Sequence, residues 1–245
     1  MALAPAEFAA SLLNEARETH PWLHHRLFHL IYEGKLDRRQ LQRVIRQQGC
    51  FFLDTLRHAA WKIISVGGSM PTFEDLERQR ALIPLVVEEG GEDTIGGKTT
   101  AHAYLFLRLA EALGIPRAEV FATEYLPTTI IEKNELFLLQ RSSVLEALCG
   151  GNIATESINP LHMKQMAEAM EKHYGVARDA LDFYYVHMEV EGDHAERAVR
   201  LLERLAVTDE EQARGRLALR RAITARQICA DGMLEAFIGG HRANP

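Results

Sequence analysis

Apolar residues recur at intervals of three and four along almost the whole chain, and this spacing limits the fold more than any other feature. Such a spacing places the apolar side chains on one face of a helix. No segment shows the period-two alternation that is typical of a half-buried strand. We therefore expect an all-α protein with seven or eight helices, short loops and no internal repeat.

Start and stop signals indicate where predicted helices begin and end. A helix over residues 21–33 is expected to stop at Gly34, and Asp37 is expected to cap a long helix over 37–65. Thr208 is the expected cap of the last helix, over 208–237. The other predicted helices include those over residues 72–89, 128–149 and 176–205.

Length and composition fit one domain over residues 1–245, with a core over about 15–238. The formal net charge of −6 provides no basic surface for nucleic acid or an anionic membrane, and no apolar run is long enough to cross a bilayer. Three widely spaced cysteines and the lack of a secretion signal in the first residues indicate a reducing cytoplasm. The expected partner is a small-molecule substrate.

The segment over residues 183–194 carries the clearest chemical signal. His187, Glu191 and His194 fall within roughly a 60° arc of a helix, so two imidazoles and a carboxylate point the same way. These donors suit Fe, Mn or Zn. Glu191 and His194 also have the Glu-x-x-His spacing by which di-metal carboxylate proteins supply two ligands from one helix turn. The alternative is a solvated polar face that carries two histidines.

Three further residues are candidates because each is a polar group in an otherwise apolar segment. Glu88 ends an apolar helix, where a carboxylate opposes the helix dipole. His102 lies on an apolar helix, and Glu156 is flanked by small and apolar residues, so its burial requires a partner or a metal. Each alone has a structural alternative, such as a hydrogen-bonded core histidine for His102. Together with the helix motif they make three carboxylates and three histidines, a full set for two metal ions that share a bridging carboxylate.

Three motifs surround these residues. They are His20-Pro-Trp-Leu23 with Gly34-Lys-Leu36 and Leu41; Glu88-Glu-Gly90 with His102-Ala-Tyr-Leu-Phe106 and Ala112-Leu-Gly-Ile115; and Glu156 with His187-x3-Glu191-x2-His194. In these motifs, over about residues 15–235, the chain resembles the haem-oxygenase-like superfamily, which includes TenA-like, PqqC-like and non-haem di-iron enzymes. The resemblance implies a haem-oxygenase-like helical bundle.

The third motif resembles the di-iron oxidase branch of that superfamily. The resemblance implies these metal-binding and catalytic residues: Glu88, His102, Glu156, His187, Glu191 and His194. Glu191 stands where aspartate is usual, and Glu88 is preferred to the adjacent Glu89. The implied cofactors are two iron ions that cycle between Fe2+ and Fe3+, with O2 as co-substrate. Glu88, His102 and His194 are expected to bind mainly one iron, and the other three residues mainly the second, with Glu156 as the bridge.

The resemblance also implies an O2-dependent oxidase or oxygenase that acts on a small carboxylate or amino-acid-like substrate in a biosynthetic pathway. A basic residue near the pocket is expected to bind the carboxylate, and the candidates are Arg26, Arg46, Lys133 and Lys164. A relative that makes p-aminobenzoate consumes a tyrosine of its own chain, and Phe28 takes the place of that tyrosine here. We therefore do not expect the self-consuming reaction.

Two other interpretations stay open. The first is a metal-free enzyme of the same fold, such as a cofactorless oxidase or a thiaminase-like hydrolase, for which Cys149 is the candidate nucleophile. TenA-type members, however, have a Gln-Asp pair where this chain has Gln47 and Gln48. The second is a non-catalytic bundle that carries a ligand or binds a protein. The resemblance is compatible with a homodimer, which no sequence feature establishes.

Overall fold

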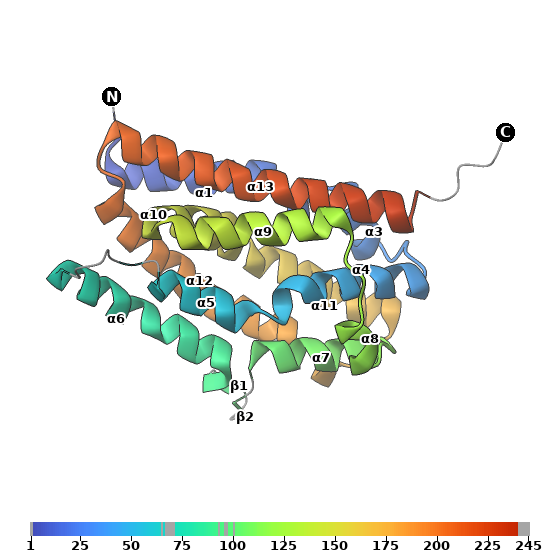
Figure 1. The fold of residues 1–245 in the computed structure, drawn as a ribbon. Coiled ribbons are helices and arrows are strands. Elements are labelled where there is room, and N and C mark those ends of the chain that lie inside the picture. Colours follow the sequence, from blue (N-terminus) through green and yellow to red (C-terminus); the bar gives the residue numbers. More distant parts are fainter. Residues whose placement is uncertain are drawn as a thin grey trace.

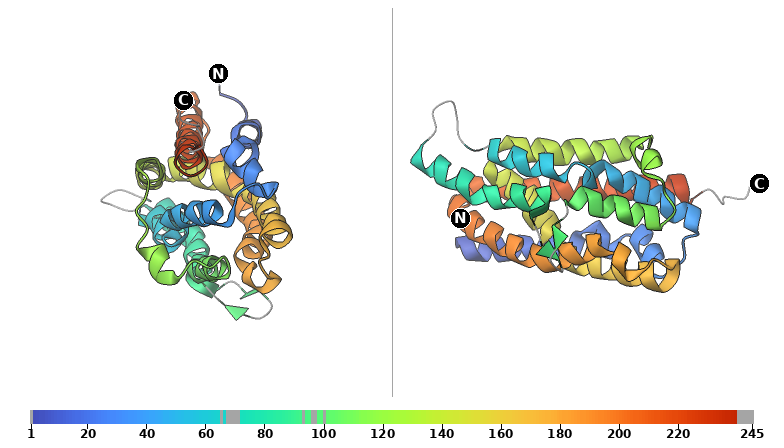
Figure 2. Two further views of the ribbon diagram at one scale, coloured as in Figure 1. Left: turned by 90° about the vertical axis from the view of Figure 1, so that its right-hand side faces the viewer. Right: turned by 90° about the horizontal axis from the view of Figure 1, so that it is seen from below.

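The helices lie side by side along one long axis, as Figure 1 shows for the computed structural model of the chain. In the end-on view of Figure 2, most of them are seen along their axes. The structure describes the backbone of residues 2–64, 66, 72–92, 94–95, 98–99 and 101–239. It describes the side chains of all of these except 85, 88, 92, 94, 95, 98, 99 and 189–196.

The described elements are almost entirely helical. The first part of the chain forms α1 Pro5–Thr19, α2 Pro21–His24, α3 Arg26–Tyr32, α4 Arg38–Phe52, α5 Thr55–Ile64, α6 Phe73–Val87, η1 Glu88–Glu92 and α7 His102–Ala112. The second part forms α8 Arg117–Phe121, α9 Pro127–Ser142, α10 Val144–Ala147, η2 Leu148–Glu156, α11 Asn159–Tyr174, η3 Arg178–Ala180, α12 Asp182–Leu205 and α13 Asp209–Phe237. Two-residue strands, β1 Thr94–Ile95 and β2 Lys98–Thr99, pair antiparallel between η1 and α7. The predicted all-α fold class is confirmed.

Local capping signals define the predicted helix starts. The Asp37 carboxylate accepts a hydrogen bond from the Gln40 backbone N–H at 2.8 Å, and the Gln40 side chain accepts one from the Asp37 N–H at 2.9 Å. Thr208 and Glu211 form the same reciprocal arrangement at the start of α13. Gly34 has a φ of +66°, the left-handed conformation that is expected where a helix stops. These predictions are confirmed.

Two helices that the sequence predicts as continuous are interrupted by side chains that bond to the backbone. The helix over 21–33 is broken at His25, whose Nδ1 accepts the backbone N–H two residues later at 3.1 Å. The helix over 128–149 is broken at Ser143, whose Oγ accepts the N–H three residues later at 3.2 Å. Such local bonds compete with helical ones. The helix over 37–65 also divides, into α4 and α5, so the number of separate segments exceeds seven or eight.

The segment η2 lies at the centre of the packing. α13 packs against α9 and η2, and α12 packs against α11 and η2. The largest fully buried side chains include Phe8, Phe106 and Phe183. Because η2 ends at Glu156, this arrangement carries a carboxylate into the middle of the bundle. In the part of the chain that the structure describes, no helix has the length and apolar character to cross a membrane.

Candidate metal centre

Two predicted carboxylate ligands lie on π-helical segments, η1 and η2. Glu88 begins η1, and Gly91 within it has a φ of 107°. Glu156 ends η2. The backbone of η2 approaches α9 closely because Gly150 has no side chain: a Cβ there would lie 2.7 Å from Leu139 Cδ1. π-Helical turns are rare and occur frequently at functional sites.

The imidazoles of His102 and His187 face each other in the interior. His102 begins α7 and His187 lies in the second turn of α12, and both side chains are buried. Their ring centroids are 4.5 Å apart. Glu89 of η1 joins them, with its Oε2 3.0 Å from His102 Nδ1. Burial alone would raise the pKa of Glu89, but the neighbouring His102 and His187 bring it down to about 2, so the carboxylate is ionised.

His187 has the proton arrangement that a metal-binding histidine needs. Its Nδ1 lies 2.6 Å from the carbonyl oxygen of Phe183, one turn earlier on α12. A carbonyl only accepts hydrogen bonds, so Nδ1 carries the proton and donates it, and the ring lone pair is on Nε2. Metal-ligating histidines are almost always held by such a bond from their second ring nitrogen. This geometry fits the role that the sequence predicts for His187.

Glu156 is partly buried and has two donors on its carboxylate. Nζ of Lys62, on α5, is 3.4 Å from Oε1. The side-chain amide of Asn152 donates to Oε2, and Lys62 also donates to Oδ1 of Asn152 at 3.0 Å. Lys62 is only 6% exposed, so little water surrounds its charge, and Glu156 is a carboxylate that helps to balance it.

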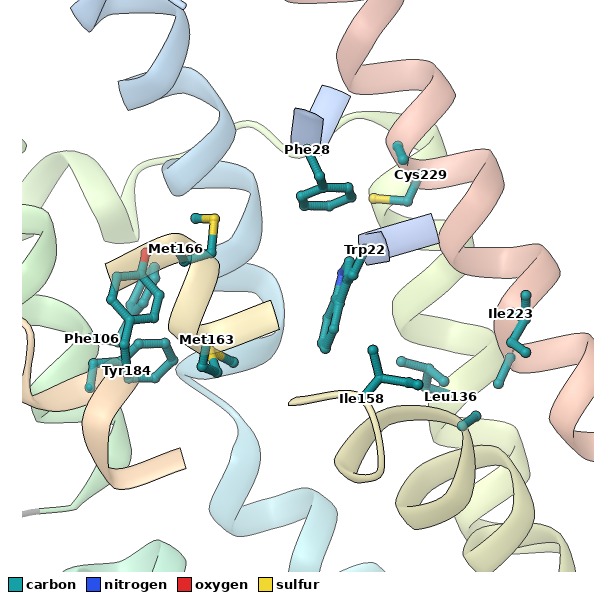
Figure 3. Packing of buried hydrophobic residues seen from close by; sticks show 14 of the residues in the cluster. Trp22, Phe28, Phe106, Leu136, Ile158, Met163, Met166, Tyr184, Ile223 and Cys229 are labelled. Carbon is teal, nitrogen blue, oxygen red and sulfur yellow. The ribbon is translucent and has the colours of Figure 1, made fainter. Parts of the chain in front are cut away.

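A cavity of about 150 Å³ lies beside these residues. Glu89, Glu156, His187 and Lys62 form part of its wall. Aromatic side chains form another part, namely Trp22, Phe28, Phe51 and Phe52. In Figure 3, Trp22 and Phe28 are close to each other, next to Cys229 of α13. Cavities of this volume can hold a single benzene ring, so the space suits a small molecule.

A second buried ion pair also lines the cavity. Nη1 of Arg226, on α13, is 3.2 Å from Oε1 of Glu132, on α9. Nη2 of Arg226 donates to the Thr155 hydroxyl at 2.6 Å. The guanidinium lies over the Trp22 ring, 4.5 Å from the ring centroid, at a distance typical of a cation–π contact. The cavity therefore contains two buried cations, each paired with a carboxylate.

The three predicted ligands whose side chains are described lie around this region. Glu156 and His187 line the cavity, and the His102 ring contacts the His187 ring. Glu89, which the sequence ranks second to its neighbour Glu88, is the glutamate seen in contact with His102. Glu89 therefore stays a candidate ligand beside Glu88.

The side chains of Glu88, Glu191 and His194 lie outside the described residues. The α12 backbone is helical from Asp182 to Leu205, so the spacing argument for positions 191 and 194 still applies. Among the side chains that are described, no group of three or more His, Cys, Asp or Glu is arranged to hold a metal ion. The six-residue metal site therefore remains a prediction.

The basic residues of the cavity differ from those proposed from the sequence. Four candidates do not line the cavity that the described side chains form: Arg26, Arg46, Lys133 and Lys164. Lys62 and Arg226 line it instead. The residues three and four positions from Arg226 on α13 are all apolar: Ala222, Ile223, Cys229 and Ala230. A lone charge on an apolar helix face is rarely buried without a partner, and this signal could have identified Arg226.

Cys149 does not have the environment of a nucleophile. It is fully buried on η2, and it is not part of the cavity wall that the described side chains form. Burial raises the pKa of its thiol to about 12. Because the thiolate is the reactive form, the structure does not support a thiaminase-like role for Cys149.

Comparison with known proteins assigns the chain to a family. A sequence model described as "iron-containing redox enzyme" matches residues 49–227, a segment that includes His102, Glu156 and His187. The chain belongs to this family of iron-containing redox enzymes. The chain is also 28% identical to a protein of Nitrosomonas europaea named 4-aminobenzoate synthase, in an alignment of 228 residues that covers 87% of each chain.

Solved structures confirm the fold. A CADD-like protein of unknown function from Nostoc punctiforme has a TM-score of 0.74 at 17% identity, over 95% of this chain and 97% of that one. A TenA homologue from Pseudomonas syringae pv. tomato has a TM-score of 0.73 at 13% identity, over 93% of both chains. At such identities the likeness concerns the fold alone. The predicted haem-oxygenase-like bundle is therefore confirmed.

Proposed function

We propose that this iron-containing redox enzyme holds two iron ions and is an O2-dependent oxidase or oxygenase. Its substrate is a small carboxylate or an amino-acid-like molecule. The observation that carries the proposal is that His187, Glu89 and Glu156 line one cavity while the buried His102 contacts two of them, within the segment that the family model matches. Several of these groups are at positions where the sequence predicts metal ligands.

The donor set fits iron. Imidazole nitrogen and carboxylate oxygen together suit Fe, Mn or Zn, and the family description favours iron. His187 donates a hydrogen bond to a carbonyl through Nδ1, so the lone pair of Nε2 is available to a metal ion. Glu89 is an ionised carboxylate. When bound, the iron ions would supply the electrons for O2 reduction and the oxidising power that acts on the substrate.

The groups of the chain itself orient the ligands and limit access of water. The Phe183 carbonyl fixes the orientation of the His187 ring, and Lys62 and Asn152 hold the carboxylate of Glu156. The aromatic side chains in the cavity wall reduce the space for water beside these polar groups. The reaction would therefore take place between aromatic side chains and buried polar groups.

The cavity supports a small anionic substrate. Its volume of about 150 Å³ suits one ring or a short chain. Arg226 supplies a guanidinium that is already paired with Glu132, so a substrate carboxylate would share this cation. The relative from Nitrosomonas europaea is named for the synthesis of 4-aminobenzoate, which is an aromatic amino carboxylate. Because Phe28 rather than a tyrosine lines the cavity, we propose that the substrate is an external molecule.

Anaerobic loading of metal-free protein with Fe(II), followed by metal analysis, tests the proposal. We expect two iron ions per chain in the wild type, and loss of bound iron in His187→Ala, Glu156→Ala and His194→Ala. His29→Ala is a matched control, because His29 is exposed on α3. The His29→Ala protein should keep both iron ions. A wild-type protein that takes up no iron would contradict the proposal.

A further inference from the structure

Lys62 is a buried cation beside the proposed iron site, and it is not part of the ligand motifs. It lies on α5, and its Nζ is 3.4 Å from Glu156 Oε1 and 3.0 Å from Asn152 Oδ1. Its side chain lines the cavity and is 6% exposed. A buried ammonium group is unfavourable unless it is paired, so Lys62 and Glu156 stabilise each other.

The pairing has a consequence for any metal ion that binds Glu156. Both carboxylate oxygens already accept hydrogen bonds, Oε1 from Lys62 and Oε2 from Asn152. A divalent ion must displace one of these donors or share an oxygen with it. If it displaces Asn152, it breaks a hydrogen bond to a neutral group. If it binds beside Lys62, two cations are held on one carboxylate, and their repulsion is strong in a poorly solvated site.

We propose that Lys62 is an internal cation that competes with metal for Glu156 and thereby weakens one of the two metal-binding steps. The inference rests on the proposed function, because it takes Glu156 as a ligand of a two-metal site. One ion is then held less tightly than it would be without Lys62. When that ion leaves, Lys62 neutralises Glu156 and keeps the carboxylate in place.

The metal-free protein is titrated with Mn(II), and the electron paramagnetic resonance signal of the free ion is recorded at each addition. This titration measures the affinity of both binding steps without O2 or turnover. We expect Lys62→Met to strengthen the weaker step on the order of tenfold, because a competing charge is lost. Lys62→Gln keeps a hydrogen-bond donor and should change the affinity in the same direction. Lys62→Arg keeps the charge and should bind like the wild type.

Lys133→Met is the matched control. It also removes a positive charge, but Lys133 lies on α9 and pairs with Asp54 at 3.0 Å, so the affinity should stay at the wild-type value. If the wild type binds two Mn(II) ions, and both Lys62→Met and Lys62→Gln bind them with unchanged or lower affinity, the proposed role of Lys62 is overturned. The two-metal site itself is not. A lack of Mn(II) binding by the wild type and every variant would overturn the two-metal site itself. Circular dichroism of each variant verifies that the helices are intact.

Discussion

At the scale of single residues, the pair Arg226 and Glu132 yields a prediction about stability. Both side chains are buried, at 7% and 5% exposure. Burial raises the pKa of the Glu132 carboxyl, and the Arg226 charge opposes this rise. Arg226→Met leaves the carboxyl without its counter-charge, so we expect the free energy of unfolding to fall by about 3–5 kcal/mol. Urea unfolding followed by circular dichroism measures the change.

The double variant Arg226→Met with Glu132→Met is the control for this prediction. Replacement of both members of a buried pair by apolar residues is often close to neutral, so the double variant should be more stable than the single one. A loss below about 1 kcal/mol in Arg226→Met, as is typical of exposed ion pairs, would mean that the pair is solvated rather than buried.

At the scale of elements, η2 keeps its central place because helices on two sides approach its backbone. A Cβ at Gly150 would lie 2.7 Å from Leu139 Cδ1 of α9 and 3.4 Å from the Ala218 carbonyl oxygen of α13. Leu139 is fully buried and close-packed, so it cannot easily move away. We expect Gly150→Ala to destabilise the protein by about 1–3 kcal/mol, measured as a lower midpoint in urea.

The adjacent Gly151→Ala is the control for this prediction. It distinguishes the close contact between position 150 and Leu139 from a general requirement of the η2 backbone for glycine. The nearest atoms to a Cβ at Gly151 are 3.8 Å away, which is ordinary van der Waals contact. Alanine also favours helical backbone by up to about 1 kcal/mol relative to glycine. Gly151→Ala should therefore be neutral or slightly stabilising. Equal losses in the two variants would show that the backbone of η2, rather than its contact with α9, requires glycine.

The start of α4 gives a smaller and independent prediction. The Asp37 side chain accepts the Gln40 N–H in a reciprocal cap. Asp37→Ala removes the acceptor and should cost about 1 kcal/mol, whereas Asp37→Asn keeps an equivalent acceptor and should be close to neutral. Thermal unfolding of the two variants side by side checks this, and equal melting temperatures for both would contradict the capping role.

These elements also show why part of the fold follows from the sequence and part does not. Asp37 and Thr208 mark helix starts through bonds to residues three positions away, so a local pattern is sufficient. The breaks at His25 and Ser143 are equally local, but His25 is not a typical capping residue and Ser143 lies inside a strongly helical pattern. The segment η2 packs against α9 and α13, and no local pattern reveals these long-range contacts.

The same distinction applies to the candidate site. The positions of Glu156 and His187 at the cavity follow from spacing and from their apolar surroundings. The partner of Glu156 does not, because Lys62 is 94 residues away in the chain and reaches it only through the packing of α5. The pairing of Arg226 with Glu132 likewise joins α13 and α9 over 94 positions. Long-range ion pairs of this kind require the fold to be known first.

At the scale of the whole molecule, two buried histidines link stability to pH. His20 and His162 are fully buried, and both rings contact the Trp22 ring. Burial, together with the Arg226 charge, lowers the pKa of His162 to about 3 and the pKa of His20 well below its usual value. The Tyr32 hydroxyl donates its proton to the Trp22 carbonyl at 2.7 Å and lies 2.6 Å from His162 Nδ1, so it accepts a hydrogen bond from the Nδ1–H of the neutral ring.

We expect the protein to lose stability as the pH falls below about 6.5. The unfolded chain takes up a proton on each of these histidines near that pH, whereas folded His162 does so only as the pH approaches about 3, so acid favours the unfolded state. Each such histidine adds a slope of about 1.4 kcal/mol per pH unit. Urea unfolding at a series of pH values below neutrality measures the slope.

His162→Gln should reduce the slope of stability against pH by the amount that one histidine contributes. His24→Gln is the control, because His24 is exposed on α2. If the slope of His162→Gln equalled that of the wild type, His162 would not be a source of the acid sensitivity.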